Sequence, residues 1–218
     1  TKVAKYGTFR ECTSLKTVTM PANLEMIGPY CFLDCTALTT VILNDKLTSI
    51  GTYAFNGCTA LKSIKFPDSL TSIGLSSFEG CTDLTTVTYG MGMTETGNMA
   101  FRNASVSKIN FSSTITEISP WGFFGCNFVK LEIPETVTKI NIRGFANCTA
   151  FQENPDDITL PPQKISGGIT PEILPRVEKP FQYVLCGDEQ SYKPKRKICY
   201  RKHLQAPIKD CLLYTSDA

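Results

Sequence analysis

Histidine is almost absent from this sequence, since His203 is the only one among 218 residues. Nucleophilic catalysis by Ser-His-Asp or Cys-His groups needs a histidine beside the nucleophile, so residues 1–202 cannot carry it. A Gly-rich phosphate loop is missing as well, and the scattered Asp residues suit turns better than acid/base catalysis. We therefore predict that the protein is not an enzyme and holds no catalytic residue, cofactor or metal.

The chain also lacks a strong net charge and a long apolar run. Its 22 Lys and Arg against 20 Asp and Glu leave a net charge of +2, which indicates no nucleic-acid partner. No segment approaches the ~20 apolar residues of a membrane-spanning helix, and no secretory signal peptide is present. Because the sequence starts with Thr1 in the middle of a repeat, we expect the native N-terminus to lie upstream, so the missing signal says nothing about localisation.

What the sequence does contain is a repeat of 22–23 residues. Each unit has a Phe, in most units a Cys three residues later, and then two apolar residues separated by one position. Seven occurrences in register indicate a stack of similar coils. The Phe column is Phe9, Phe32, Phe55, Phe78, Phe101, Phe123 and Phe145, and the column after it is Cys12, Cys35, Cys58, Cys81, Ala104, Cys126 and Cys148.

The paired apolar residues, such as Val41 and Leu43, share one face of a short strand because side chains alternate along a strand. Such a strand cannot bury that face alone, but the same strand from successive repeats can stack at ~4.8 Å into a parallel sheet. Pro21, Pro67 and Pro134 should end strands, since proline cannot donate to the ladder. The prediction is an α/β-type, mainly β solenoid of about seven coils, with a parallel sheet and a stacked Phe core.

Glycine stands four residues before the Phe at Gly28, Gly51, Gly74 and Gly97, and we expect it to supply a backbone with φ > 0. Asn141 in the same column tolerates that conformation too.

The later repeats depart from the pattern. The fifth carries Ala104 in place of Cys, the fifth and sixth are one residue shorter, and Gly90-Met-Gly92 replaces the Pro turn of the fourth. After Phe151 the pattern breaks, with residues 158–161 as a candidate last strand, so we expect a fading terminal repeat.

Ten cysteines are present, six of them in the ladder. We expect the ladder thiols to be free and buried, because equivalent residues on successive coils point the same way and a disulfide needs facing Cβ vectors. Disulfides, which an even cysteine count in a secreted protein suggests, are the alternative. One column of thiols cannot surround a metal ion, whose ligands must converge. Whether Cys186 and Cys199 are bonded stays open.

The segment Gly51–Ile73 reads Gly-x-x-Ala-Phe-x-Gly-Cys-x-x-Leu-x-x-Ile-x-x-Pro-x-x-Leu-x-x-Ile. This motif resembles the BspA-type, or Treponema pallidum-type, leucine-rich repeat, over residues 1 to about 150–165. The resemblance implies a leucine-rich repeat stack. It also implies a surface or secreted protein, of bacteria or some protists, that adheres to host proteins or to other cells.

The strand residues between the inward-facing pairs should point outward, and leucine-rich repeat proteins commonly bind partners on this surface. The alternative is that Thr is simply a good strand former on a solvated face. Water ordering by a flat Thr ladder is disfavoured, since only the β-strands at 17–19 and 86–88 carry the paired form. The candidate partner-binding residues are Thr17, Thr19, Thr40, Ile42, Ser63, Lys65, Thr86, Thr88, Lys108, Asn110, Lys130 and Glu132.

Trp121, the only tryptophan, is expected at the opposite edge, near Phe123 and Phe124. A core or capping role is favoured there over ligand stacking.

We predict three segments in the chain. The leucine-rich repeat solenoid covers 1–165, and an irregular, Pro-containing basic tail covers 166–210. Residues 171–218 hold 9 Lys and Arg against 6 Asp and Glu, and a solvated linker is favoured there over an anionic-surface contact. The last eight residues, 211–218, match the translation of a sequencing-library adapter, so we exclude them from fold reasoning.

Three hypotheses on function follow. The first is a non-catalytic adhesion scaffold, extracellular or at the cell surface, that binds protein or glycan on another cell or matrix, with no membrane span in this fragment. The second is a repeat module of a larger secreted enzyme or effector whose catalytic part lies outside this sequence. The third is a structural spacer that binds nothing. An anchor or sorting signal in the full-length gene would support the first, and a catalytic domain the second.

Overall fold

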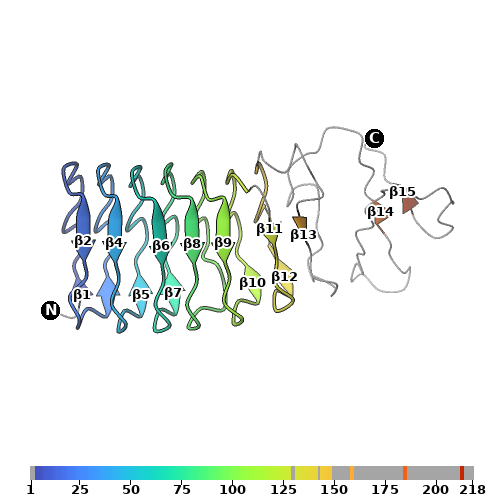
Figure 1. Ribbon diagram of the computed structural model, residues 1–218, viewed down its shortest axis with the longest axis horizontal. Coiled ribbons are helices and arrows are strands. Elements are labelled where there is room, and N and C mark those ends of the chain that lie inside the picture. The colour runs from blue at the N-terminus through green and yellow to red at the C-terminus, as the bar shows by residue number, and fades with distance from the viewer. Residues whose placement is uncertain are drawn as a thin grey trace.

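The computed structural model describes residues 3–128, 131–141 and 143–148, and the backbone of three two-residue strands further along the chain. In these residues the chain winds into a solenoid of about six turns that contains no helix. Figure 1 shows one row of strands along the stack and a second row below it. The mainly β solenoid with 22–23-residue coils and parallel strands is therefore confirmed.

The first row consists of the predicted strands, which we call the long strands. They pair in parallel and in register, as β2–β4, β6–β8–β9 and β11–β13. The last of these pairs confirms a strand within residues 158–161. The long strands are β2 (Thr17–Thr19), β4 (Thr40–Ile42), β6 (Ser63–Lys65), β8 (Thr86–Thr88), β9 (Lys108–Asn110), β11 (Leu131–Glu132) and β13 (Ile158–Thr159).

The second row, the short strands, forms where each repeat closes, and the sequence did not predict it as a separate ladder. β1, β3, β5 and β7 pair in parallel, as do β10 and β12. Between these groups a single parallel bridge joins Glu95 to Glu117. The short strands are β1 (Val3–Ala4), β3 (Met26–Ile27), β5 (Ser49–Ile50), β7 (Ser72–Ile73), β10 (Glu117–Ile118) and β12 (Lys139–Ile140).

Two further strands, β14 (Val184–Leu185) and β15 (Leu212–Leu213), form an antiparallel pair. β15 falls in the segment attributed to adapter translation. The rest of the predicted basic tail and of residues 211–218, with Cys186 and Cys199, lies outside the described residues.

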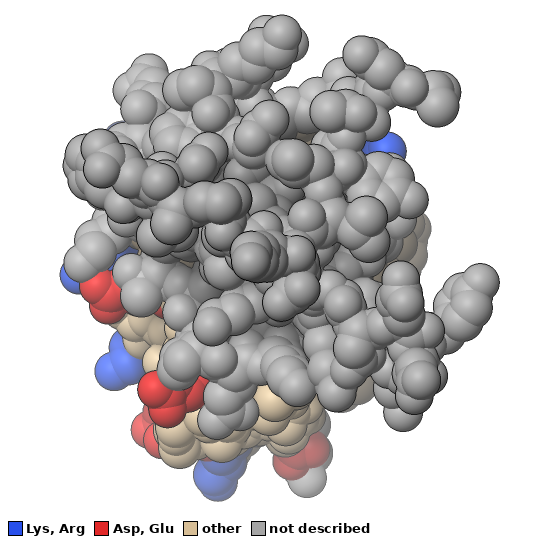
Figure 2. All heavy atoms as spheres, turned by 90° about the vertical axis from the view of Figure 1, so that its right-hand side faces the viewer, with Lys and Arg blue, Asp and Glu red and all other residues tan. Residues whose placement is uncertain are grey.

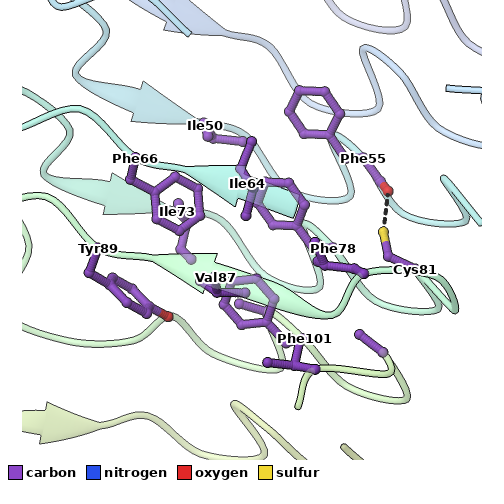
Figure 3. Close-up of a cluster of buried hydrophobic side chains, with 14 of the residues drawn as sticks. Ile50, Phe55, Ile64, Phe66, Ile73, Phe78, Cys81, Val87, Tyr89 and Phe101 are labelled. Carbon is purple, nitrogen blue, oxygen red and sulfur yellow. Dashed lines mark hydrogen bonds between the residues drawn. The ribbon is translucent and has the colours of Figure 1, made fainter. Parts of the chain in front are cut away.

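The Phe column forms the centre of the core, as predicted. Phe55 is fully buried and stacks on Phe32 at 5.0 Å between ring centroids and on Phe78 at 5.1 Å. The column continues in the same nearly parallel arrangement from Phe9 to Phe145. Figure 3 shows Ile and Val side chains from both rows of strands packing around these rings. Stacking one aromatic ring per coil therefore joins each coil to the next.

The Cys column lies next to the Phe column, and its thiols form hydrogen bonds to the backbone of the Phe residues. Except for Cys12 of the first coil, which is half-buried, each ladder thiol donates to the backbone carbonyl of the Phe one coil earlier, for example Cys81 to Phe55 at 3.2 Å (Figure 3). The same bond joins Cys58 to Phe32 at 3.1 Å. The seven cysteines among the described residues are free thiols. The ladder is thus a packing and hydrogen-bonding device, which confirms the free-thiol prediction over the disulfide alternative.

The glycine prediction is wrong for most of its column. Gly28, Gly51, Gly74 and Asn141 do not have positive φ; only Gly97, at +90°, does. The reason for glycine is space: a Cβ on Gly51 would lie 2.7 Å from the carbonyl carbon of Gly28 on the preceding coil. Backbone packs directly on backbone at this corner, and a side chain would force the coils apart.

Positive φ occurs instead in two other columns, two residues before each Phe and one residue before each Cys. Apart from Glu11 in the first coil, the second column holds residue types that adopt this conformation at low cost, which are Asp34, Gly57, Gly80, Asn103, Gly125 and Asn147. The first column holds larger residues, which are Tyr30, Tyr53, Ser76, Met99, Trp121 and Arg143 after an initial Gly7.

Candidate binding face

The predicted binding residues lie along one side of the stack because the long strands are in register. First strand positions align from coil to coil, and so do last positions. Two columns therefore run along the stack. By repeat position, one contains Thr17, Thr40, Ser63, Thr86 and Lys108, and the other contains Thr19, Ile42, Lys65, Thr88 and Asn110.

These side chains are exposed, except Thr86 and Thr88, which are half-buried. Ile42 is 51% exposed and is the one large apolar side chain on the two columns. Asn110 Nδ2 donates to Thr88 Oγ1 at 2.9 Å and so links two neighbouring coils across the surface. Of the remaining predicted residues, Glu132 is exposed in β11, whereas Lys130 lies outside the described residues.

Two lysines at the edge of this surface were missed in the sequence. Lys16 and Lys62 are exposed and directly precede β2 and β6. Their backbone carbonyls accept bonds from the next coil, where Thr39 and Thr85 donate through both backbone N–H and hydroxyl groups. Their spacing of two repeats is visible in the sequence, but both lie just before a strand, where side-chain alternation makes no prediction. We call the exposed residues of 16–19, 39–42, 62–65, 85–88 and 107–110 the long-strand face.

Charge is divided between the two sides of the solenoid. Over residues 16–110 the long-strand face carries Lys16, Lys62, Lys65 and Lys108 and no Asp or Glu, and the next long strand, β11, carries the exposed Glu132. None of these four lysines forms an ion pair within the part of the chain that the structure describes. Seen from the C-terminal end of the stack, the charged side chains in view project outward from the rim of the coils (Figure 2).

The short-strand side is acidic and pairs part of its charge. Glu25, Glu95 and Glu117 lie in or beside its strands. Glu117 accepts from Lys139 Nζ at 2.9 Å and from Asn141 Nδ2 at 2.6 Å. Partial burial opposes ionisation, but these two hydrogen bonds outweigh it and lower the pKa of Glu117. Four lysines with no ion pair among the described residues thus lie on the opposite, long-strand face, while Lys5 and Lys46 are exposed elsewhere on the repeats.

Trp121 lies in a different environment, among arginines. Its ring contacts Phe124 at 4.8 Å between centroids, as its predicted neighbourhood implies. The guanidinium carbon of Arg143 lies 4.5 Å from the ring centre and that of Arg102 lies 5.6 Å from it. Arg102 also pairs with Glu79 at 3.5 Å. With its ring occupied by cations of its own chain, Trp121 joins neighbouring coils.

Burial disfavours the thiolate form of the buried ladder cysteines. Burial raises the pKa of Cys35 to about 11 and that of Cys81 to about 12, and it raises the pKa of Cys58 further. A thiol is reactive as the thiolate, which these sites disfavour. Among the described residues, no group of three or more His, Cys, Asp and Glu converges as a metal site would require.

This geometry defines the class of protein: a leucine-rich repeat solenoid with short parallel strands and a Phe–Cys ladder. The chain belongs to the BspA type leucine rich repeat family. The description of that family's repeat region, given as six copies, matches residues 2–129 and 118–163. The family resemblance read from the sequence is therefore confirmed.

Solved structures agree with this assignment. The crystal structure of the T. pallidum leucine rich repeat protein TpLRR is 31% identical, with a TM-score of 0.63, over 68% of this chain and 70% of that one. A leucine-rich repeat protein from Eubacterium ventriosum shares the fold, at 19% identity and a TM-score of 0.52, over 61% of this chain and 42% of that one. A search of the curated proteins found no match. No helix of the described residues has the length and hydrophobicity to cross a membrane.

Proposed function

We propose that the protein is a non-catalytic adhesion scaffold, secreted or displayed at a cell surface, that binds partners through its long-strand face. The observation that carries this proposal is the character of that face. It is an in-register array of exposed Thr, Ser and Lys side chains, supported by a core that fixes every strand. A rigid scaffold with an exposed polar surface is suited to recognition rather than to chemistry.

Family membership supports the same conclusion. Proteins with BspA-type repeats are typically surface or secreted proteins associated with adhesion to host proteins and to other cells, and this chain carries the repeat over most of its described length. The partners we propose are protein or glycan on another cell or matrix. Thr as a mere strand former on a solvated surface explains the hydroxyls but not the clustering of four lysines on one side.

A matched pair of substitutions tests the role of the face. Ile42 on a long strand is 51% exposed, and Met26 on a short strand is 40% exposed. Ile42→Asp and Met26→Asp therefore place the same charge on the two sides of one solenoid, at positions of similar exposure. Beads coated with the full chain are measured for attachment to a cultured epithelial cell layer.

The proposal predicts that Ile42→Asp lowers attachment strongly while Met26→Asp keeps the parent level. Equal attachment by both variants, with both melting like the parent, would show that the long strands are not the contact surface. Attachment no better than that of uncoated beads for the parent chain would support the spacer hypothesis instead.

A further inference from the structure

The four lysines of the long-strand face form a regular arrangement along the stack. Lys16 lies on the first coil, Lys62 and Lys65 on the third, and Lys108 on the fifth. Successive strands in a sheet are ~4.8 Å apart, so positive charge recurs at intervals of about 10 Å over about 19 Å. The intervening coils contribute hydroxyl groups to the same columns. The lysines occupy three positions, which are the residue before the strand (Lys16, Lys62), the first strand residue (Lys108) and the last (Lys65). Together they form a band along the stack in which cationic and hydroxyl-bearing coils alternate.

A band of this kind matches a linear polymer that carries negative charge at regular intervals. The lysines have no carboxylate partner among the described residues, so their charge is available to a ligand. Glu95 lies on the short-strand side, where its negative charge disfavours such a polymer relative to the lysine-bearing face.

The composition of the face distinguishes among anionic polymers. Stable contacts with proteins depend on Trp, Tyr and Arg anchors in the centre of an interface, and the long-strand face has none of these residues. Single-stranded nucleic acid is held by aromatic rings on which bases stack, which the face also lacks. Lysine ammonium, threonine hydroxyl and asparagine amide groups are hydrogen-bond partners for sulfate groups and sugar hydroxyls.

We propose that the long-strand face binds a sulfated linear polysaccharide, of the glycosaminoglycan type, laid along the axis of the solenoid. This inference rests on the proposed function and names the chemical class of its partner. Lys16, Lys62, Lys65 and Lys108 contact sulfate groups, while the Thr and Asn side chains between them contact sugar hydroxyls.

The test uses fluorescein-labelled heparin dodecasaccharide and the full chain, with affinity measured by fluorescence anisotropy at several salt concentrations. The test variant is Lys62→Ala/Lys65→Ala, and the control is Lys5→Ala/Lys46→Ala. All four residues are exposed, so both variants lose the same charge from the surface. Lys16→Ala/Lys108→Ala is a second test variant on other coils, and thermal melting establishes that each variant is folded.

The proposal predicts an affinity for heparin about tenfold lower in each test variant and within about twofold of the parent in the control. The dependence of log affinity on log salt should become shallower by about two, because two fewer counterions are released. Single-stranded DNA and poly-L-glutamate of similar length should bind more weakly than heparin to the parent chain.

Three results would overturn the proposal. Equal affinity in test and control variants would place heparin elsewhere, for example on the basic stretch Lys193–Lys197 of the sequence. If DNA or polyglutamate bound as tightly as heparin, the face would attract any negatively charged polymer and would not be specific for sulfated polysaccharide. Absence of heparin binding would exclude the ligand class. The proposed function has a separate test, since Ile42→Asp can abolish cell attachment even where heparin does not bind.

Discussion

Replacing Phe55 by Ala tests whether the aromatic column holds the coils together. The ring is fully buried and stacks on both sides, against Phe32 and Phe78, at 5.0 and 5.1 Å with interplanar angles of 5° and 8°. The substitution removes both stacking contacts and leaves a ring-sized cavity between two coils. Neighbouring strands are held in register on either side, so the coils have little freedom to collapse into the space.

The expected loss is about 3–5 kcal/mol of unfolding free energy, which covers the lost apolar burial, the cavity and the two stacking contacts. Phe9 provides an internal control, because it is 41% exposed and stacks on one side only, against Phe32. Phe9→Ala should therefore cost less than half as much. At about 2–4 °C per kcal/mol, Phe55→Ala should lower the melting temperature by about 6–20 °C.

The assay is urea unfolding and thermal melting of both variants, followed by circular dichroism. Because each repeat contacts only its neighbours, the Phe55 variant should also unfold with a broader transition than the parent as the stack divides at the third coil. A loss below about 1 kcal/mol, or equal losses in the two variants, would refute the role of the aromatic column as the main connection between coils.

Three further predictions concern the backbone corner and the thiol column. Gly51→Ala should lower the free energy of unfolding by about 2 kcal/mol or more, because its Cβ would meet the backbone of the preceding coil. Gly80 has φ +71° and nothing within 4 Å of where a Cβ would lie, so Gly80→Asn should cost under about 1 kcal/mol. The urea unfolding midpoints of the two variants test this difference. Ala104→Cys should add up to about 1 kcal/mol through a thiol–carbonyl bond like the others in the ladder, and a lower melting temperature would contradict this. Burial raises the pKa of Cys81 from 9.0 to about 12. The folded state therefore favours the neutral thiol, so this contribution to stability is complete below pH 9 and is lost as pH rises toward 12; a Cys81→Ala variant whose urea midpoint falls as steeply would contradict it.

The sequence was sufficient for the coil, the long strands and the core. Two long strands end two residues before Pro21 and Pro67, as expected because proline has no amide proton to donate to the ladder. The Phe and Cys columns follow from the period of the repeat. Any position that recurs every 22–23 residues must meet its own equivalents in a stack, so the contacts along each column are determined by the repeat itself.

The backbone conformation of the corners was not predictable in the same way. Glycine can serve either a positive φ or a close approach, and composition alone does not separate these uses at Gly51 and Gly74. The column before the cysteines offered a clearer signal, since it mixes Gly with Asp34 and Asn103, the types that share the left-handed region. Tyr30 and Trp121 in the other positive-φ column carry no such signal, because the surrounding bonds impose the conformation on them.

The binding face was predictable in outline from alternation, but its charge was not. Lys16 and Lys62 precede the strands, where alternation says nothing, and their exposure on this face depends on how the coil turns into the strand. The acidic character of the short-strand side was likewise not predictable, because the sequence pattern does not distinguish the short strands as a separate ladder.

The most direct test of the account is a lysine acetylation footprint of the chain bound to cells. The full chain is attached to an epithelial cell layer, treated briefly with an acetylating reagent, recovered, and compared by mass spectrometry with chain treated free in solution. The account predicts that Lys16, Lys62, Lys65 and Lys108 become protected on binding, while Lys5 and Lys46 are modified to the same extent in both samples. Protection of Lys5 or Lys46 with the four long-strand lysines still reactive would contradict it.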